Sequence, residues 1–248
     1  MKRCYFCVAD RNNTQYYEGL KNSLAKFTKD PLILIDDAKI QQLGDPNFFY
    51  RATPIIASAL LREYDEVCKL DADQIILGNL DHIWEGDFDV AVVKNSNPKE
   101  DASYPVRLLD VSPAAYVNCG FVVMRSKLFV EHWLKLCMSG HFNNYQYREQ
   151  DLLNIMVFYM SNQFGGPYKV RHLDDENKFH GLVFKQYEPQ VELRDGKLVL
   201  PKSNEWPLDG DKEVVCWHVA GGNTPNKMNY KIRFSEEVSK YIDTLVKP

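Results

Sequence analysis

Two carboxylates one residue apart, Asp71 and Asp73, are the side chains of this chain best placed to do chemistry. They follow the mostly apolar run 67–70 and precede a second apolar run. In extended backbone, side chains two positions apart point the same way, so the two acids can share one cation. Oxygen-rich sites suit Mg²⁺ or Mn²⁺, which in turn hold phosphate oxygens. The pair therefore predicts a metal-diphosphate site at the end of a strand.

Position selects this pair from three copies of the same Asp-x-Asp pattern. The copy at 87–89 precedes a strand-like run, and the copy at 209–211 is typical of a turn, so we interpret both as solvated loop acids. Only the copy at 71–73 directly follows a buried-looking strand, which is where open α/β sheets bind their ligands. We therefore take Asp71 and Asp73 as the candidate site.

The bulk properties of the chain are those of an ordinary globular protein. Its 248 residues can form one large α/β domain, and we see no linker or internal repeat. The formal net charge is −4, which argues against a nucleic-acid-binding protein, because such proteins carry a concentrated basic surface. The N-terminal apolar run stops at Asp10, which is too short for a signal peptide or a membrane span. We expect a soluble, cytoplasmic protein with no nucleic-acid partner and no integral membrane segment.

The six cysteines are expected to be buried, reduced thiols. Cys4 and Cys7 have the spacing of some redox and zinc motifs. In a strand, however, their side chains have opposite parity and face opposite sides of the sheet. No second cysteine pair exists to complete a zinc site.

Strands alternate with helices along the chain, which predicts a mainly parallel central sheet flanked by helices. A turn sequence at 194–197 between two alternating arms predicts a small β-hairpin at 191–200. The polar, proline-containing stretch 95–117 is expected to be a long loop over a site. The expected strands are 5–9, 32–35, 67–70, 90–94, 120–124 and 214–217, and the expected helices are 12–27, 54–63, 127–138, 151–160 and 236–246.

Taken in order, these segments resemble one family. Leu-Asp-Ala-Asp at 70–73 matches the Leu-Asp-x-Asp core of nucleotide-sugar glycosyltransferases with the GT-A fold, most closely the retaining family eight of glycogenin and bacterial galactosyltransferases. Asn-Cys-Gly-Phe at 118–121 resembles the family's Asn-small-Gly stretch near the donor sugar. Gln-Asp-Leu-Leu-Asn at 150–154 resembles the stretch at its reaction centre. Each match is weak alone, and their order and spacing make the resemblance specific.

The resemblance implies a Rossmann-like GT-A single domain over residues 1–248. Its nucleotide-binding half would span about 1–94 and its acceptor and catalytic half about 95–230, followed by a C-terminal helix at 235–246. It implies a metal site formed by Asp71, Asp73 and His218, and roles at the donor sugar for Gln150 and Asp151. The residues that it implies for binding the donor are Asp10, Tyr16, Arg51, Asp71, Asp73, Asn118, Gly221 and Lys227.

Two positions depart from the family pattern. Glu149 stands before Gln150 where the family usually has aspartate, a shorter acid. The His-x-x-Gly part of the family's ending fits residues 218–221, but Lys227 comes three residues late and no Pro-Trp follows it. The metal role of His218 is unaffected, whereas a phosphate role for Lys227 requires a differently folded loop.

The expected function is transfer of a sugar from a nucleotide sugar, expected to be a UDP-sugar, to a sugar or glycoconjugate acceptor. The reaction is expected to retain the anomeric configuration and to use Mn²⁺ or Mg²⁺. An inverting transferase with Glu149 or another carboxylate as the base is one alternative. A sugar nucleotidyltransferase is another, although residues 10–14 lack the glycines of its usual loop. A non-catalytic sugar- or nucleotide-binding module would not need the predicted metal ligands. A hydrolase is disfavoured because the acid pair is too close in sequence to flank a glycosidic bond.

Overall fold

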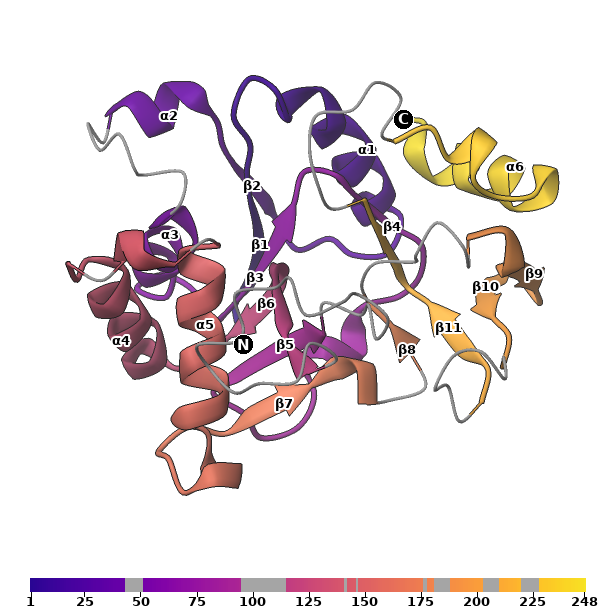
Figure 1. The fold of residues 1–248 in the computed structure, drawn as a ribbon. Helices are drawn as coiled ribbons and strands as arrows, with labels where there is room; N and C mark the ends of the chain where they lie inside the picture. The colour runs from indigo at the N-terminus through magenta and orange to yellow at the C-terminus, as the bar shows by residue number, and fades with distance from the viewer. Residues whose placement is uncertain are drawn as a thin grey trace.

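The computed structural model describes residues 1–42, 51–94, 115–140, 142–145, 147–175, 178–180, 188–202, 210–219 and 228–248 (Figure 1). Its helices are α1 (Thr14–Ala25), α2 (Asp37–Gln42), α3 (Ala52–Leu60), α4 (Lys127–Cys137), α5 (Glu149–Tyr159) and α6 (Glu236–Val246). Its strands are β1 (Arg3–Val8), β2 (Leu32–Ile35), β3 (Glu66–Asp71), β4 (Gln74–Ile76), β5 (Val90–Lys94), β6 (Val117–Met124), β7 (Val170–His172), β8 (Lys178–Phe179), β9 (Glu192–Arg194), β10 (Lys197–Leu200), β11 (Lys212–Val214) and β12 (Cys216–His218).

The central sheet has six strands in the order β2-β1-β3-β6-β5-β7. β1 runs parallel to β2 and β3, and β5 runs parallel to β7. β6 runs antiparallel to both of its neighbours, β3 and β5. The predicted mainly parallel α/β sheet is therefore confirmed. Because β6 is reversed, its beginning, rather than its end, lies at the carboxyl end of β3.

Helices cover both faces of this sheet (Figure 1). One hydrophobic cluster joins α3, α4 and α5 to the strand side chains of one parity, including Cys4. The other cluster joins α1 and the 3-10 helix η2 (Asp81–Trp84) to side chains of the other parity, including Cys7. All six cysteines are free and buried, so the interpretation of Cys4 and Cys7 as buried thiols on opposite faces is confirmed.

A second sheet, in the order β8-β11-β10-β9, lies beside α6 (Figure 1). β9 and β10 form the predicted hairpin. The single strand expected at 214–217 is instead two strands, β11 and β12. Val214 pairs with Phe179 of the second sheet, whereas Cys216 pairs with Ile76 of β4. The chain therefore changes partner at Val215, which a sequence pattern does not reveal.

The hairpin turn depends on two residues with positive φ, Asp195 at 50° and Gly196 at 75°. A β-carbon costs about 1–2 kcal/mol in this conformation. Gly196→Ala is therefore expected to lower the free energy of unfolding by about 1 kcal/mol in urea denaturation. Asp195→Asn is the matched control, because asparagine tolerates this conformation, and it should change stability very little. Equal stability of the two variants would contradict this account of the turn.

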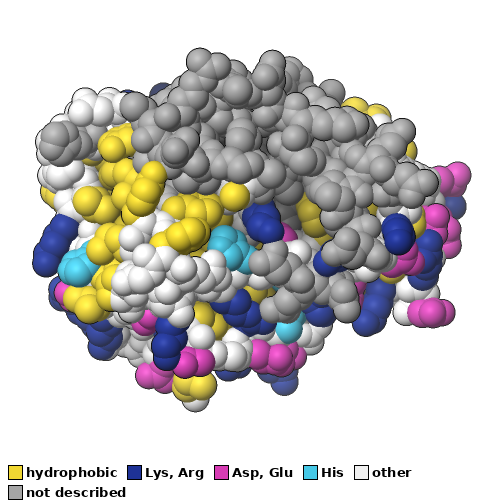
Figure 2. All heavy atoms as spheres, turned by 60° about the horizontal axis from the view of Figure 1, so that its bottom comes forward, with side chains coloured by type: hydrophobic (Ala, Val, Ile, Leu, Met, Phe, Trp, Pro, Cys, Tyr) yellow, Lys and Arg dark blue, Asp and Glu magenta, His cyan; other side chains and the backbone are white. Residues whose placement is uncertain are grey.

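Charges of both signs mix on the surface. On the face shown in Figure 2, lysine and arginine side chains lie among aspartate and glutamate side chains along the lower rim. Among the described helices, none is both long and apolar enough to cross a bilayer.

Candidate active site

Two carboxylates and an imidazole converge at the carboxyl end of β3. Asp71 is the last residue of β3, and His218 is the last residue of β12. β12 pairs antiparallel with β4, so that His218 lies opposite Gln74 and next to Asp73. The His218 Nε2 atom lies 3.4 Å from Asp71 Oδ2 and 3.2 Å from Asp73 Oδ1. One ligand atom from each of the three residues lies within 4.8 Å of the others, close enough to hold one metal ion.

The reason for this convergence differs from the predicted one. Asp71 and Asp73 do not share one extended strand, because Ala72 and Asp73 form a turn between β3 and β4. The two carboxylates meet because the chain turns back. The imidazole joins them because β12 pairs with β4. The prediction of extended backbone through the pair was therefore wrong.

Gly120 of β6 forms the floor of this site. Leu70 pairs with Phe121 in the antiparallel ladder, which brings Asp71 opposite Gly120. A β-carbon on Gly120 would lie 2.5 Å from His218 Cε1 and 2.6 Å from both Asp71 Oδ2 and Asn118 Oδ1. These separations are shorter than van der Waals contact. The site therefore requires glycine at this position.

Two buried polar residues that sequence reasoning missed hold Asp71 in place. The Lys69 ammonium is 2.5 Å from Asp71 Oδ1 and 2.7 Å from the carbonyl oxygen of Cys119. Gln74 accepts the backbone N–H of Asp71 at 3.2 Å and donates to the carbonyl of Gly120 at 3.0 Å. A signal existed for Lys69, since a lysine inside an apolar strand with the same parity as Asp71 needs a buried partner.

The electrostatics of the site are those of closely paired charges. Although burial opposes ionisation, the Lys69 ammonium and the His218 ring hold the pKa of Asp71 below its ordinary value. Burial also disfavours a charged imidazole, yet the Asp73 and Asp71 carboxylates raise the pKa of His218 to about 9. Without a cation, two carboxylates thus face an ammonium and an imidazolium. A bound metal ion would take the place of the His218 proton, because only neutral imidazole can be a ligand.

This donor set fits a divalent cation. Two carboxylate oxygens and one imidazole nitrogen suit Mn²⁺, and the oxygens also suit Mg²⁺. Because Lys69 holds one oxygen of Asp71, the other oxygen, Oδ2, faces His218. The geometry therefore leaves one oxygen of Asp71 directed toward the position where a metal would bind.

The beginning of α5 is tied to the beginning of β6, beside Gly120. Gln150 Oε1 accepts the backbone N–H of Cys119 at 2.9 Å. Asp151 is buried and accepts the backbone N–H of Tyr147 at 2.7 Å and the hydroxyl of Tyr116. Burial raises the pKa of Asp151. The stretch 150–154 is thus next to the acidic site, and its side chains hold the backbone that carries Asn118 and Gly120.

Asn118 is a buried neighbour of the same cluster. Its Oδ1 atom accepts the backbone N–H of Gly120 at 2.6 Å. Asn154, one turn along α5 from Gln150, binds both backbone groups of Val117, with its Oδ1 accepting at 2.8 Å and its Nδ2 donating at 3.0 Å. The two asparagines therefore hold the backbone at the start of β6 through hydrogen bonds.

The Glu149 carboxylate is hydrogen-bonded to the N-terminus of α3. Its oxygens accept the Thr53 hydroxyl at 2.9 Å and the Thr53 backbone N–H at 3.3 Å. Burial raises the pKa of Glu149 to about 7, despite the opposing Lys69 charge and the Thr53 hydrogen bonds. Glu149 thus couples the first turns of α5 and α3.

This raised pKa predicts a pH-dependent stability. In the unfolded chain Glu149 loses its proton near pH 4.5, whereas in the folded protein it keeps the proton up to about pH 7. Stability should therefore fall as the pH rises through this window, by up to about 3 kcal/mol. Glu149→Gln should remove this part of the slope and match or exceed the wild type above pH 7. Urea unfolding at several pH values tests this, because the difference between the two proteins isolates Glu149 from other titrating groups.

Glu149→Ala is the control for the Glu149→Gln experiment. It removes the capping hydrogen bonds along with the charge, so it should be less stable than Glu149→Gln at every pH, by about 1 kcal/mol. An unchanged pH slope in Glu149→Gln would contradict the raised pKa.

Two of the predicted nucleotide-binding residues, Asp10 and Tyr16, lie after β1 and on α1. Asp10 follows β1, and Val8 of β1 pairs with Asp71, so Asp10 is at the same sheet edge as the acidic site. Its Oδ1 atom accepts the backbone N–H groups of Asn12 and Asn13, at 3.1 and 3.0 Å, and so shapes the turn into α1. Tyr16 packs partly buried against the cluster beneath α1.

Arg51 is the N-cap residue of α3. Its guanidinium stacks 4.5 Å from the centre of the Phe142 ring, and its Nη1 contacts Met138 Sδ at 3.8 Å. Gly221 and Lys227, the remaining predicted donor-binding residues, lie outside the described residues, as does most of the expected loop 95–117.

Solved structures share this arrangement of elements. The galactosyltransferase LgtC, in complex with donor and acceptor sugar analogs, has a TM-score of 0.59 and 16% identity, over 98% of this chain and 96% of that chain. The bifunctional glycosyltransferase WbbM matches with a TM-score of 0.55 and 14% identity over 93% of this chain, which spans about half (51%) of that chain. A glycosyltransferase involved in glycosylation of the major capsid of PBCV-1 has a TM-score of 0.55 and 9% identity, over 92% and 99% of the two chains.

No protein-family model and no curated protein sequence matches the chain. At these identities the likeness establishes the fold. The chain has the GT-A fold of glycosyltransferases, as the sequence motifs predicted.

Proposed function

We propose that this protein is a metal-dependent glycosyltransferase that moves a sugar from a UDP-sugar to a sugar or glycoconjugate acceptor with retention of anomeric configuration. The observation that carries the proposal is the convergence of Asp71, Asp73 and His218 at the carboxyl end of β3, within the fold of sugar transferases. The proposal covers the whole chain as one domain, with donor binding in about 1–94 and acceptor binding and catalysis in about 95–230.

The chemistry assigns separate tasks to the residues of the site. Transfer breaks the bond between the anomeric carbon and the diphosphate, which then gains negative charge. Asp71, Asp73 and His218 would hold Mn²⁺ or Mg²⁺, and a bound divalent cation stabilises that charge as it develops. Gly120 leaves room beside these ligands, because a side chain there would occupy the same space.

The donor would extend from this point in two directions. Asp10 and Tyr16, on the turn and helix that follow β1, would receive the uracil base. In the other direction, Asn118, Gln150 and Asp151 lie at the start of β6 and α5, where the sugar would be placed. Arg51, Gly221 and Lys227 complete the proposed donor-binding set.

The contacts of Glu149 disfavour it as the base of an inverting reaction. An inverting enzyme needs a carboxylate base aimed at the acceptor hydroxyl. Glu149 instead binds the Thr53 hydroxyl and backbone. In Glu149→Gln, transfer should continue, and proton NMR of the product should show the anomeric configuration of the donor. If Glu149→Gln loses transfer and the wild-type product has the inverted configuration, the inverting alternative is favoured.

Thermal stability in the presence of nucleotides tests the proposal directly. UDP and UDP-sugars are compared with other nucleoside diphosphates, each with Mn²⁺ and with chelator. A ligand at 100 times its dissociation constant stabilises by about 2.7 kcal/mol, which is readily measured. We expect stabilisation by uridine nucleotides only when Mn²⁺ is present. No response to any nucleotide, with or without metal, would overturn the proposal.

A further inference from the structure

A second pocket lies at the opposite end of the β4–β12 ribbon from the acidic site. His218 and Gln74 pair at one end of this ribbon, and Leu77 follows it at the other. The three residues of β4 separate Asp73 from Leu77, and four steps of extended chain span about 13 Å. The pocket has a volume of about 400 Å³, within the range of small-molecule sites. It is therefore large enough for a ligand and too far away to be part of the metal site.

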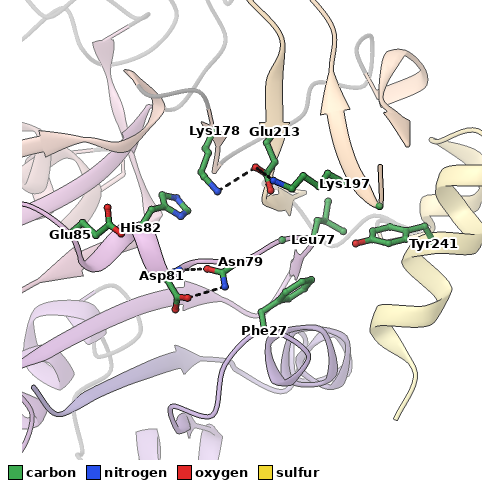
Figure 3. Close-up of a pocket in the computed structure, with 12 residues that line it drawn as sticks. Phe27, Leu77, Asn79, Asp81, His82, Glu85, Lys178, Lys197, Glu213 and Tyr241 are labelled. Carbon is green, nitrogen blue, oxygen red and sulfur yellow. Dashed lines mark hydrogen bonds and ion pairs between the residues drawn. The ribbon is translucent and has the colours of Figure 1, made fainter. Parts of the chain in front are cut away.

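The pocket is built by elements from distant parts of the chain (Figure 3). The segment after β4, the β9–β10 hairpin, β11 and α6 all contribute walls. Two aromatic rings, Phe27 after α1 and Tyr241 of α6, lie on one side of it (Figure 3). Aromatic faces of this kind pack well against the apolar faces of flat ligands.

The opposite side carries charged groups of both signs. Glu213 Oε2 lies 3.4 Å from the ammonium groups of both Lys178 and Lys197, and the three side chains form a chain across the pocket (Figure 3). Asn79 donates to Asp81 Oδ2 at 2.9 Å. The pocket lining therefore contains both hydrogen-bond donors and acceptors.

These features favour a neutral ligand with many hydroxyl groups. Three carboxylates line the pocket with two lysines, so it has no excess of positive charge to hold a phosphate or a carboxylate group. The histidine of the pocket, His82, adds no charge, because burial and the neighbouring His180 lower its pKa to about 3. A lining with both donors and acceptors matches sugar hydroxyls, which both donate and accept.

We propose that this pocket binds a neutral saccharide unit, separately from the donor site. The sugar would stack on Phe27 or Tyr241 and exchange hydrogen bonds with Asn79, Lys197 and Glu213. It could be a distal unit of the acceptor glycan or a free oligosaccharide. Saccharide binding here needs neither the metal nor the donor, and only the assignment to the acceptor rests on the proposed function.

Saturation-transfer NMR and titration calorimetry of the whole chain test the proposal. The probes are lactose, maltose and N-acetylglucosamine, with inorganic phosphate as the charged comparison. Lys197→Ala and Tyr241→Phe each remove one hydrogen-bonding group and leave the backbone of the pocket unchanged. Each should therefore weaken saccharide binding roughly fivefold. Lys240→Ala, the neighbour of Tyr241 outside the pocket, is the matched control. Asp73→Asn should bind saccharide like the wild type even when transfer is lost.

The results separate the two saccharide sources and can overturn the proposal. If Lys197→Ala raises the KM for the acceptor and leaves that for the donor unchanged, the pocket holds part of the acceptor. If both KM values stay unchanged while direct binding weakens, it holds a free saccharide. Absence of saccharide binding to the wild type, or binding that Asp73→Asn abolishes and both pocket variants retain, would overturn the proposal. The proposal would also be overturned if the wild type binds inorganic phosphate more tightly than the saccharides and Lys197→Ala weakens that phosphate binding.

Discussion

Replacing Asp73 with asparagine is expected to reduce sugar transfer by at least about 100-fold while leaving the fold intact. Asp73 supplies one of the two carboxylates beside His218, and its Oδ1 atom is 3.2 Å from the imidazole. Asparagine has nearly the same shape but no charge, so the site loses half of the negative charge that would hold a divalent cation. Transfer is measured by release of UDP with saturating Mn²⁺, and metal binding is measured separately by calorimetry.

The control for this experiment is a variant of another Asp-x-Asp copy. Asp87 is highly exposed and forms an ion pair with Lys169 on the surface. Asp87→Asn should therefore retain full transfer and metal binding. Full activity in Asp73→Asn would refute the metal assignment, whereas equal loss in both variants would point to a general effect of removing an acid.

The substitution Gly120→Ala, which adds one methyl group, is expected to displace the side chains of the same site. The new β-carbon would lie 2.5–2.6 Å from atoms of His218, Asn118 and Asp71, so at least one of these side chains must move. Overpacking of this kind costs about 1–3 kcal/mol of stability. We expect Gly120→Ala to lose that stability in urea denaturation and to bind Mn²⁺ at least about tenfold more weakly, because ligands displaced by even a fraction of an ångström no longer share one ion.

Gly140→Ala provides the matched control for Gly120→Ala. A β-carbon on Gly140 would meet no atom within 4 Å, so stability and metal binding should both remain close to wild type. Normal metal binding by Gly120→Ala would show that the site can relax around a methyl group and that the contact is not restrictive.

Elements that carry a complete local signal were predictable from the sequence. The strand Leu32–Ile35, the strand Val90–Lys94 and the helix Glu236–Val246 have the predicted bounds. Each combines an apolar run or a helical periodicity with polar residues at its ends, so local preference and burial agree. The hairpin at Asp195 and Gly196 was predictable for the same reason, since its turn needs residues that tolerate positive φ.

Short elements were not predicted. β4, β7 and β8 contain three, three and two residues, too few for any periodicity to be recognised. Helix α2 is six residues long and has no buried side chain, so no apolar stripe marks it. The three short strands form through pairing with β12, β5 and β11 respectively. Each of these partner strands is distant in the sequence.

The sequence by itself determined the chemical inventory of the site: two acids at a strand end, a histidine after a late strand and a glycine in the Asn-Cys-Gly stretch. It also determined the alternation of strands and helices that leads to the GT-A fold. Only the tertiary structure decided that His218 reaches Asp73 through β4, and that the reversed strand β6 brings Gly120 against Asp71. Only the tertiary structure showed that Glu149 caps α3 and that Lys69 holds one oxygen of Asp71. The reason is physical: composition and periodicity record which face of an element is buried, whereas strand order and register depend on pairings between segments far apart in the chain.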